Sequence, residues 1–188
     1  MVFQFKEIVF AILALCWVVL LVAFIQARPW ARMHVSETRP PETKWGSVLI
    51  AAGLAIIFLP FAPAGPPKSA STLGIAIGLS VLSLLLCLSA MIGARTARWM
   101  PEGAIRPQPL RTGSYQLVRH PVYTSLILLA LATACAVSWW LWMFAGMFFV
   151  ILGIDLRATG DDLLLADIFQ EEFPEIQSET KSYIPFLH

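Results

Sequence analysis

The chain has 188 residues, of which 58% are hydrophobic and 13% are charged, and its formal net charge is +1. A soluble domain averages about 25% charged residues, so this composition excludes an ordinary soluble protein and predicts an all-α integral membrane protein that crosses the membrane several times. The near-neutral charge offers no basic surface for nucleic acid.

Three apolar runs, at residues 8–25, 48–65 and 73–94, are each long enough to cross a hydrocarbon core. The first is longer than a signal-peptide core of about 7–15 residues, which indicates a retained helix. Pro60 and Pro63 predict a kinked or frayed end for the second helix. Small residues in the third favour close packing between membrane helices; these are Gly74, Gly78, Ser80, Ser83 and Ser89.

Residues 122–154 carry no charge, but the run is too short for two ideal spans of about 20 residues and long for one. Trp139 and Trp140 lie midway and favour a membrane interface. We therefore expect a tight hairpin of two shortened helices, with one long tilted helix as the alternative. The fold expected is thus five transmembrane helices, the last two forming this hairpin.

The last segment, residues 155–188, holds eight of the twelve acidic residues. Leu163, Leu164 and Ile168 form a short apolar face among these acids, which is typical of an amphipathic surface helix. We expect this C-terminal helix to stop near Pro174, and we interpret Asp155 as a residue at a helix end.

Basic residues distribute unevenly between the polar loops. The loops after the first and third spans, at 28–45 and 95–120, hold four and five Lys or Arg, whereas the loop after the second holds only Lys68. By the positive-inside rule both basic loops are cytoplasmic. Five spans then place the N-terminus outside and the acidic tail in the cytoplasm, where the tail can meet the second basic loop.

Arg119 and His120 stand at the boundary between that loop and the uncharged run. Together they offer a fixed positive charge and a side chain that titrates near neutral pH, and Pro121 suits the first turn of the next helix. The alternative is structural: an arginine that reaches toward the interface and a histidine that caps the helix.

The surrounding string, Leu110-x-x-Gly113-x-Tyr115-x-x-Val118-Arg119-His120-Pro121-x-Tyr123, resembles the signature of the isoprenylcysteine carboxyl methyltransferase family. These are integral membrane enzymes that use S-adenosylmethionine and are related to phospholipid methyltransferases. The family has a second motif after its last membrane helix, an arginine followed four and five residues later by two glutamates. Arg157, Asp161 and Asp162 occupy this register, which continues without a gap to Pro185.

The resemblance covers roughly residues 72–188. The length of the chain predicts a single membrane domain over residues 1–188, with two N-terminal helices in 1–70, and the resemblance implies a methyltransferase-like core in 71–188. The chain departs from the family pattern at several positions. Aspartates replace both glutamates, Ser125 and Gln170 replace glycines, and Phe173 and Ile176 replace tyrosines.

Methyl transfer from a sulfonium requires donor and acceptor to be held in line, and it needs no metal ion. Arg119 and His120 are candidates to bind the cofactor's carboxylate, and Asp161 or Asp162 to bind its amine or ribose hydroxyls. Arg157 is the candidate to orient an acidic acceptor, because a guanidinium matches a carboxylate in two places. Its alternative role is that of an arginine at a helix end.

The resemblance implies that the segment around Pro121 and the tail acids border the cofactor pocket, and Tyr115 and Tyr123 are candidates to line it or to anchor the interface. The function expected is methylation of a lipidic or isoprenoid-like acceptor at the cytoplasmic face. A relative that has lost activity and serves as a membrane scaffold or binding protein is the alternative. A transporter is disfavoured because the spans contain no ionisable residues.

Overall fold

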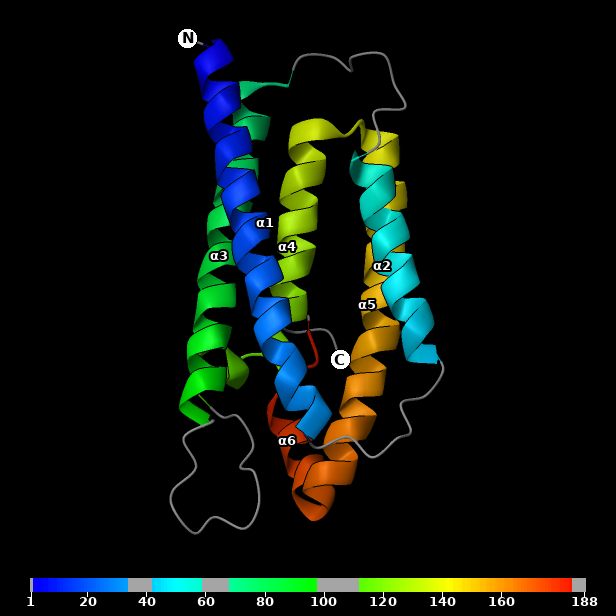
Figure 1. Cartoon of the computed structure of the whole chain (residues 1–188). Coiled ribbons are helices and arrows are strands. Elements are labelled where there is room, and N and C mark those ends of the chain that lie inside the picture. Colours follow the sequence, from blue (N-terminus) through cyan, green and yellow to red (C-terminus); the bar gives the residue numbers. More distant parts are fainter. Residues whose placement is uncertain (1, 34–41, 59–67, 98–111, 184–188) are drawn as a thin grey trace.

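All the regular elements that the structure describes are helices (Figure 1). In this computed structural model the described residues are 2–33, 42–58, 68–97 and 112–183. The elements are, in order, α1 (Val2–Met33), α2 (Glu42–Phe58), α3 (Ala70–Ala97), η1 (Gly113–Gln116), α4 (Pro121–Val137), α5 (Trp140–Phe169), η2 (Gln170–Glu172) and α6 (Phe173–Glu179). The long helices alternate in direction, and α6 lies at the end of the bundle opposite the start of α1 (Figure 1).

Three helical segments are long and apolar enough to cross a membrane: Glu7–Ile25, Ala70–Ala94 and Trp140–Asp167. They confirm the predicted all-α fold of a membrane protein. The apolar parts of α2 and α4, Thr43–Phe58 and Pro121–Val137, are shorter. Five membrane crossings therefore stay a prediction.

The predicted hairpin at residues 122–154 is confirmed and the single long helix is wrong, but only α4, with 17 residues, is shortened, whereas α5 has 30. Ser138 and Trp139 separate α4 from α5, both with extended backbone. The Ser138 hydroxyl donates to the carbonyl of Ile57 at the end of α2 (2.7 Å), and the Lys68 ammonium donates to the carbonyl of Ser138. Polar groups freed by the turn therefore find partners within the protein, as an apolar environment requires.

The prediction of a separate helix after residue 155 is wrong in its start, because residues 155–169 continue α5. Leu163 is exposed, and the contact of its apolar face with a membrane surface stays a prediction. The helix ends at Gln170, whose φ is 41°, and Pro174 stands in the first turn of α6 instead of stopping a helix.

The first polar loop is shorter than predicted at both ends, since α1 continues to Met33 and α2 begins at Glu42. An acidic residue suits this position because the helix N-terminus carries partial positive charge. The predicted kink at Pro60 and Pro63 lies outside the described residues.

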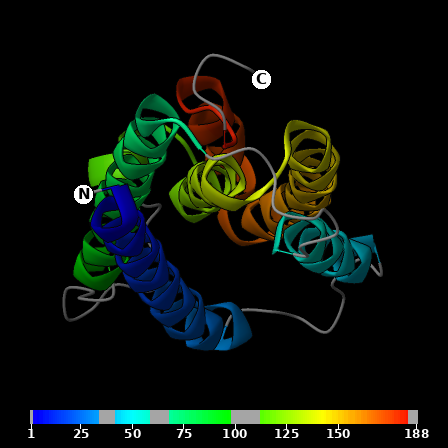
Figure 2. The same cartoon turned by 90° about the horizontal axis from the view of Figure 1, so that it is seen from above.

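Helix α4 occupies the centre of the bundle and packs against α1, α2, α3 and α5 (Figure 2). No residue from 121 to 136 is exposed. Small side chains, including Ala130, Ala132 and Ala134, allow the neighbouring helices to approach closely. A helix enclosed by protein on all sides need not match the thickness of the hydrocarbon core, which accounts for its 17 residues.

Helices α2 and α5 touch through paired glycines. A Cβ on Gly153 would lie 2.6 Å from the carbonyl oxygen of Gly46, and a Cβ on Gly53 would lie 2.6 Å from that of Gly146. Within each helix the two glycines are seven residues apart, Gly46 and Gly53 in α2 and Gly146 and Gly153 in α5, so they lie on one face of that helix. The two backbones therefore pack directly against each other.

The packing role predicted for the small residues of α3 is confirmed only in part. The Ser83 hydroxyl donates to the carbonyl of Ser125 (2.7 Å), and the Ser89 hydroxyl accepts from the amide of Ser114 (3.0 Å). A Cβ added to Gly74 or Gly78 would meet nothing within 4 Å, so these two glycines face away from the bundle.

Replacing Gly153 by alanine is expected to lower the free energy of unfolding by roughly 1–3 kcal/mol, because the new methyl meets a backbone oxygen that cannot rotate away. Gly78→Ala is the matched control; its methyl enters open space, and alanine is the better helix former, so we expect no loss. Thermal unfolding in detergent, followed by circular dichroism, measures both. Equal unfolding temperatures for the two variants would contradict the close contact.

Gln170→Gly is expected to stabilise the protein by about 1 kcal/mol, because glycine adopts positive φ without steric cost. The control is Glu172→Gly, two residues later at φ −82°, where glycine only adds unfolded-state entropy and should destabilise by a similar amount. Denaturant midpoints in detergent measure the two shifts. A loss of stability in Gln170→Gly would show that this backbone conformation is not strained.

Candidate functional site

Three segments that are distant in sequence meet at the end of the bundle that carries α6 (Figure 1). They are residues 118–120 before α4, the last part of α5, and residues 180–183 after α6. The contact predicted between the second basic loop and the acidic tail is therefore confirmed. The side of the membrane on which it lies stays a prediction.

Asp162 of α5 holds both Arg119 and His120. Arg119 binds it through two nitrogens, with Nη2 2.9 Å from Oδ2 and Nε 3.3 Å from Oδ1. The His120 Nε2 lies 2.8 Å from Oδ1. The exposed fractions of the three side chains are 8% for Arg119, 10% for His120 and 18% for Asp162, so this is a largely buried ionic cluster. Burial of this kind requires the charges to be compensated.

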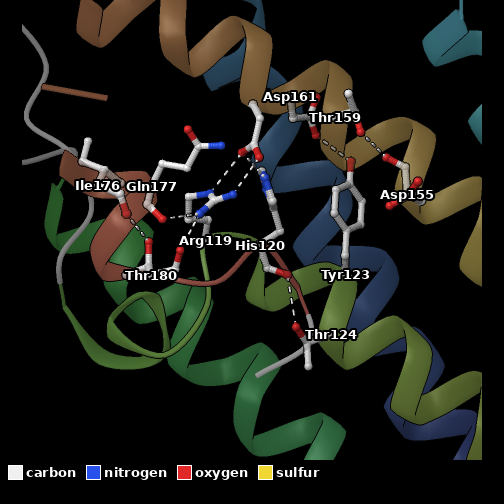
Figure 3. Close-up of polar contacts among 11 residues, drawn as sticks. Arg119, His120, Tyr123, Thr124, Asp155, Thr159, Asp161, Ile176, Gln177 and Thr180 are labelled. Carbon is white, nitrogen blue, oxygen red and sulfur yellow. Dashed lines mark hydrogen bonds and ion pairs between the residues drawn. The ribbon is translucent and has the colours of Figure 1, made fainter. Parts of the chain in front are cut away.

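The remaining nitrogen of Arg119 faces the C-terminal segment (Figure 3). Nη1 donates to the carbonyl of Gln177 at 3.4 Å and to the carbonyl of Thr180. All three guanidinium nitrogens thus have protein acceptors. On the side of the C-terminal segment, a ligand reaches Nη1 by replacing one of its two carbonyl acceptors.

His120 does not cap α4, although it stands at the N-cap position. Its side chain makes no cap hydrogen bond and instead contacts Asp162. Pro121 is buried in the first turn of the helix, as predicted. The capping role that was the alternative for His120 is therefore wrong.

Tyr123 links the other two candidates from the second motif. Its hydroxyl donates to Asp161 Oδ2 at 2.6 Å and accepts from Arg157 Nε at 3.2 Å. The ring is only 6% exposed and contacts the rings of Phe24 and His120. In Figure 3 the phenol points from α4 toward Asp161. Tyr123 is thus an interior bridge, and its alternative role as an interfacial anchor is wrong.

Helix α2 contributes Ser47, a residue that the sequence did not single out. The Arg157 Nη1 donates to the Ser47 hydroxyl at 2.6 Å. A Cβ on Gly46 would lie 2.6 Å from Arg157 Cγ, so the glycine makes room for this side chain. The equal seven-residue spacings of Gly46 with Gly53 and of Gly146 with Gly153 were the signal that could have paired α2 with α5.

Two predicted residues have other surroundings. Tyr115 lies in η1 with its ring against α3, where a Cβ on Gly93 would be 3.2 Å from Tyr115 Cδ2. Asp155 lies inside α5 rather than at its end, and it accepts a hydrogen bond from the Tyr183 hydroxyl at 2.8 Å. Burial, and then this hydrogen bond, raise the pKa of Tyr183, so its phenol stays a donor at neutral pH.

The arrangement sets two acids against two guanidinium groups and an imidazole, which suits a ligand that carries both signs of charge. Guanidinium groups bind carboxylates, and aspartates bind ammonium or hydroxyl groups. The aspartates reach their partners at 2.6–2.9 Å, so the shorter side chains leave no gap. Within the described part of the chain, no three His, Cys, Asp or Glu side chains are grouped to hold a metal ion.

No protein-family model, curated protein or solved structure matches the chain. The family resemblance therefore rests on the two motifs themselves. The function has to be argued from the chemistry of the residues that they bring together.

Asp162→Asn is expected to lower the free energy of unfolding by at least about 2 kcal/mol, because it removes the charge that compensates the buried Arg119 guanidinium and changes the hydrogen-bond partner of His120. Asp161→Asn is the matched control on the same helix turn. Its amide oxygen can still accept from Tyr123, so we expect a loss below about 1 kcal/mol. Denaturant unfolding in detergent compares them, and an equal loss would show that Asp162 does not compensate Arg119 and His120.

Proposed function

We propose that the protein is an integral membrane methyltransferase that uses S-adenosylmethionine. Its acceptor is a lipidic or isoprenoid-like molecule with a carboxylate or similar head group. The observation that supports this most is the contact between the two motifs: Arg119 and His120 from the first lie against Asp162 from the second. Residues that resemble one signature thus gather in one cluster, although about 40 positions separate them.

The residues of this cluster fit the cofactor's amino-acid end. That end carries a carboxylate and an ammonium group, and the cluster offers a guanidinium and an imidazole beside two aspartates. Arg119 and His120 would hold the carboxylate, and Asp161 or Asp162 the ammonium or the ribose hydroxyls. When bound, the cofactor supplies an activated methyl group on a sulfonium. The chain's own contribution is to bind, orient and exclude water.

Arg157 would orient an acidic acceptor. Its Nε and Nη1 are fixed by Tyr123 and Ser47, and in the part of the chain that is described Nη2 has no hydrogen-bond partner. A guanidinium held in this way can present its free edge to an oxyanion. A carboxylate acceptor has no proton to lose at neutral pH, so its methylation requires no general base.

The proposed site faces the cytoplasm. The ends of α1, α2 and α3 that flank the two basic loops lie at the same end of the bundle as α6 (Figure 1). The positive-inside rule assigns that end to the cytoplasm. A lipidic acceptor would enter sideways from the bilayer, with its apolar tail between helices and its head group near Arg157.

A catalytically inactive relative that binds or scaffolds membrane components is the second candidate. The observation that favours it is the closed state of the ionic cluster, in which every nitrogen of Arg119 already has a protein acceptor. The strained Gln170, at a position where the resembled family has glycine, points the same way.

Titration of S-adenosylhomocysteine into folded, detergent-purified protein is expected to show saturable binding. Arg119→Lys keeps the charge but loses the two-point geometry, and Asp161→Asn loses the negative charge. Each should weaken binding by about 10-fold or more. Asp167→Asn, an exposed position on the same helix, is the control and should bind like the parent.

Transfer of a labelled methyl group from S-adenosylmethionine to membrane lipid extract tests turnover with the same variants. Folded parent protein that binds no S-adenosylhomocysteine would overturn the methyltransferase. Binding without transfer, with affinity gained when glutamate replaces both Asp161 and Asp162, would favour the inactive relative.

A further inference from the structure

The chain after α6 forms what we call the C-terminal strap, residues 180–183. It runs parallel to residues 118–120, and Val118 and Lys181 form an isolated bridge. The Arg119 amide donates to the carbonyl of Lys181 at 2.7 Å, and the His120 amide donates to the carbonyl of Ser182 at 2.9 Å. The backbone of the strap is thus hydrogen-bonded to the backbone of Arg119 and His120, two charged or titratable residues of the first motif.

Two side chains fasten the far end of the strap. The Thr124 hydroxyl donates to the carbonyl of Tyr183 at 2.6 Å, and the Tyr183 hydroxyl donates to Asp155 Oδ1 at 2.8 Å. At the near end the carbonyl of Thr180 accepts from Arg119 Nη1. The strap and the carbonyl of Gln177 in α6 together cover Nη1 of Arg119 (Figure 3).

Hydrogen bonds hold most of the strap, and the partly buried Tyr183 also packs against the hydrophobic core. Lys181 is exposed, and Thr180, Ser182 and Tyr183 are only partly buried. The preceding helix is anchored differently, since Phe173 of α6 is buried. Segments with few buried apolar contacts open locally at a low cost in free energy, while better-packed elements stay in place.

We propose that the C-terminal strap is a releasable cover over Arg119, and that its opening lets an anionic ligand take the place of the Thr180 carbonyl while the Gln177 carbonyl of α6 stays in place. The exchange is balanced, because Arg119 Nη1 gives up one carbonyl acceptor and gains an oxyanion. The identity of the anion, the cofactor's carboxylate, rests on the proposed function. The release of the strap does not.

Two variants loosen the strap without changing the ionic cluster. Thr124→Val removes the hydrogen bond to the Tyr183 carbonyl, and Tyr183→Phe removes the one to Asp155. Thr159→Val is the matched control. Its hydroxyl bonds the carbonyl four residues earlier, as that of Thr124 also does, but it does not touch the strap.

Opening is measured by trypsin cleavage after Lys181, which needs the backbone there to leave its partners. Access to the cation is measured by phenylglyoxal modification of Arg119, counted relative to Arg157 by mass spectrometry. Loss of one hydrogen bond should raise both rates by about fivefold in Thr124→Val and Tyr183→Phe. Thr159→Val should leave both unchanged. Faster cleavage without faster modification of Arg119 overturns the cover.

The ligand arm uses S-adenosylhomocysteine in calorimetry. If the strap must open for binding, part of the affinity is lost to that opening, so loosened variants should bind up to about fivefold more tightly than the parent. Equal or weaker affinity in folded, loosened variants overturns the role of the strap in binding. Absence of binding in all variants contradicts the methyltransferase proposal. The rates of trypsin cleavage and of Arg119 modification still decide whether the strap covers Arg119.

Discussion

The ion pair between Arg119 and Asp162 joins the parts of the structure that the candidate site needs. A guanidinium that is 8% exposed must have a counter-charge and acceptors for its donors. Asp162 supplies the charge from α5, and the carbonyls of Gln177 and Thr180 supply acceptors from the chain around the end of α6. One side chain thus fixes the start of α4, the end of α5 and the C-terminal strap relative to one another.

The continuity of α5 carries this constraint into the membrane part of the bundle. Gly153 packs against the backbone of α2, and Arg157 lies one turn later, so the glycine contact places the guanidinium beside Ser47. Asp161 follows after another turn and receives the hydroxyl of Tyr123. Close helix packing and site geometry therefore share one register, and a shift of α5 against α2 would disturb both.

Sequence reasoning found the hairpin and the approach of the tail to Arg119 and His120, because both follow from charge or from uninterrupted apolar length. It found Arg157, Asp161 and Asp162 through the resemblance to the second motif. It missed the continuity of α5, since the periodicity of residues 155–169 is the same for a surface helix and for a helix that extends from the membrane. It also missed Ser47, because a contact between α2 and α5 depends on which faces meet, and glycines reveal that only once the partner is known.

The closed ionic cluster is compatible with a ligand site. An empty site with an unpaired, buried guanidinium would cost several kcal/mol, so a resting state in which Asp162 and two carbonyls occupy Arg119 is the stable one. A zwitterionic ligand brings its own carboxylate and ammonium, so it can replace these contacts in kind. Exchange of partners costs much less than the creation of new buried charge. The aspartates favour this arrangement, because their short side chains hold Arg119 and Tyr123 directly, while the carbonyl of Thr180 is the partner that leaves in the proposed opening of the strap.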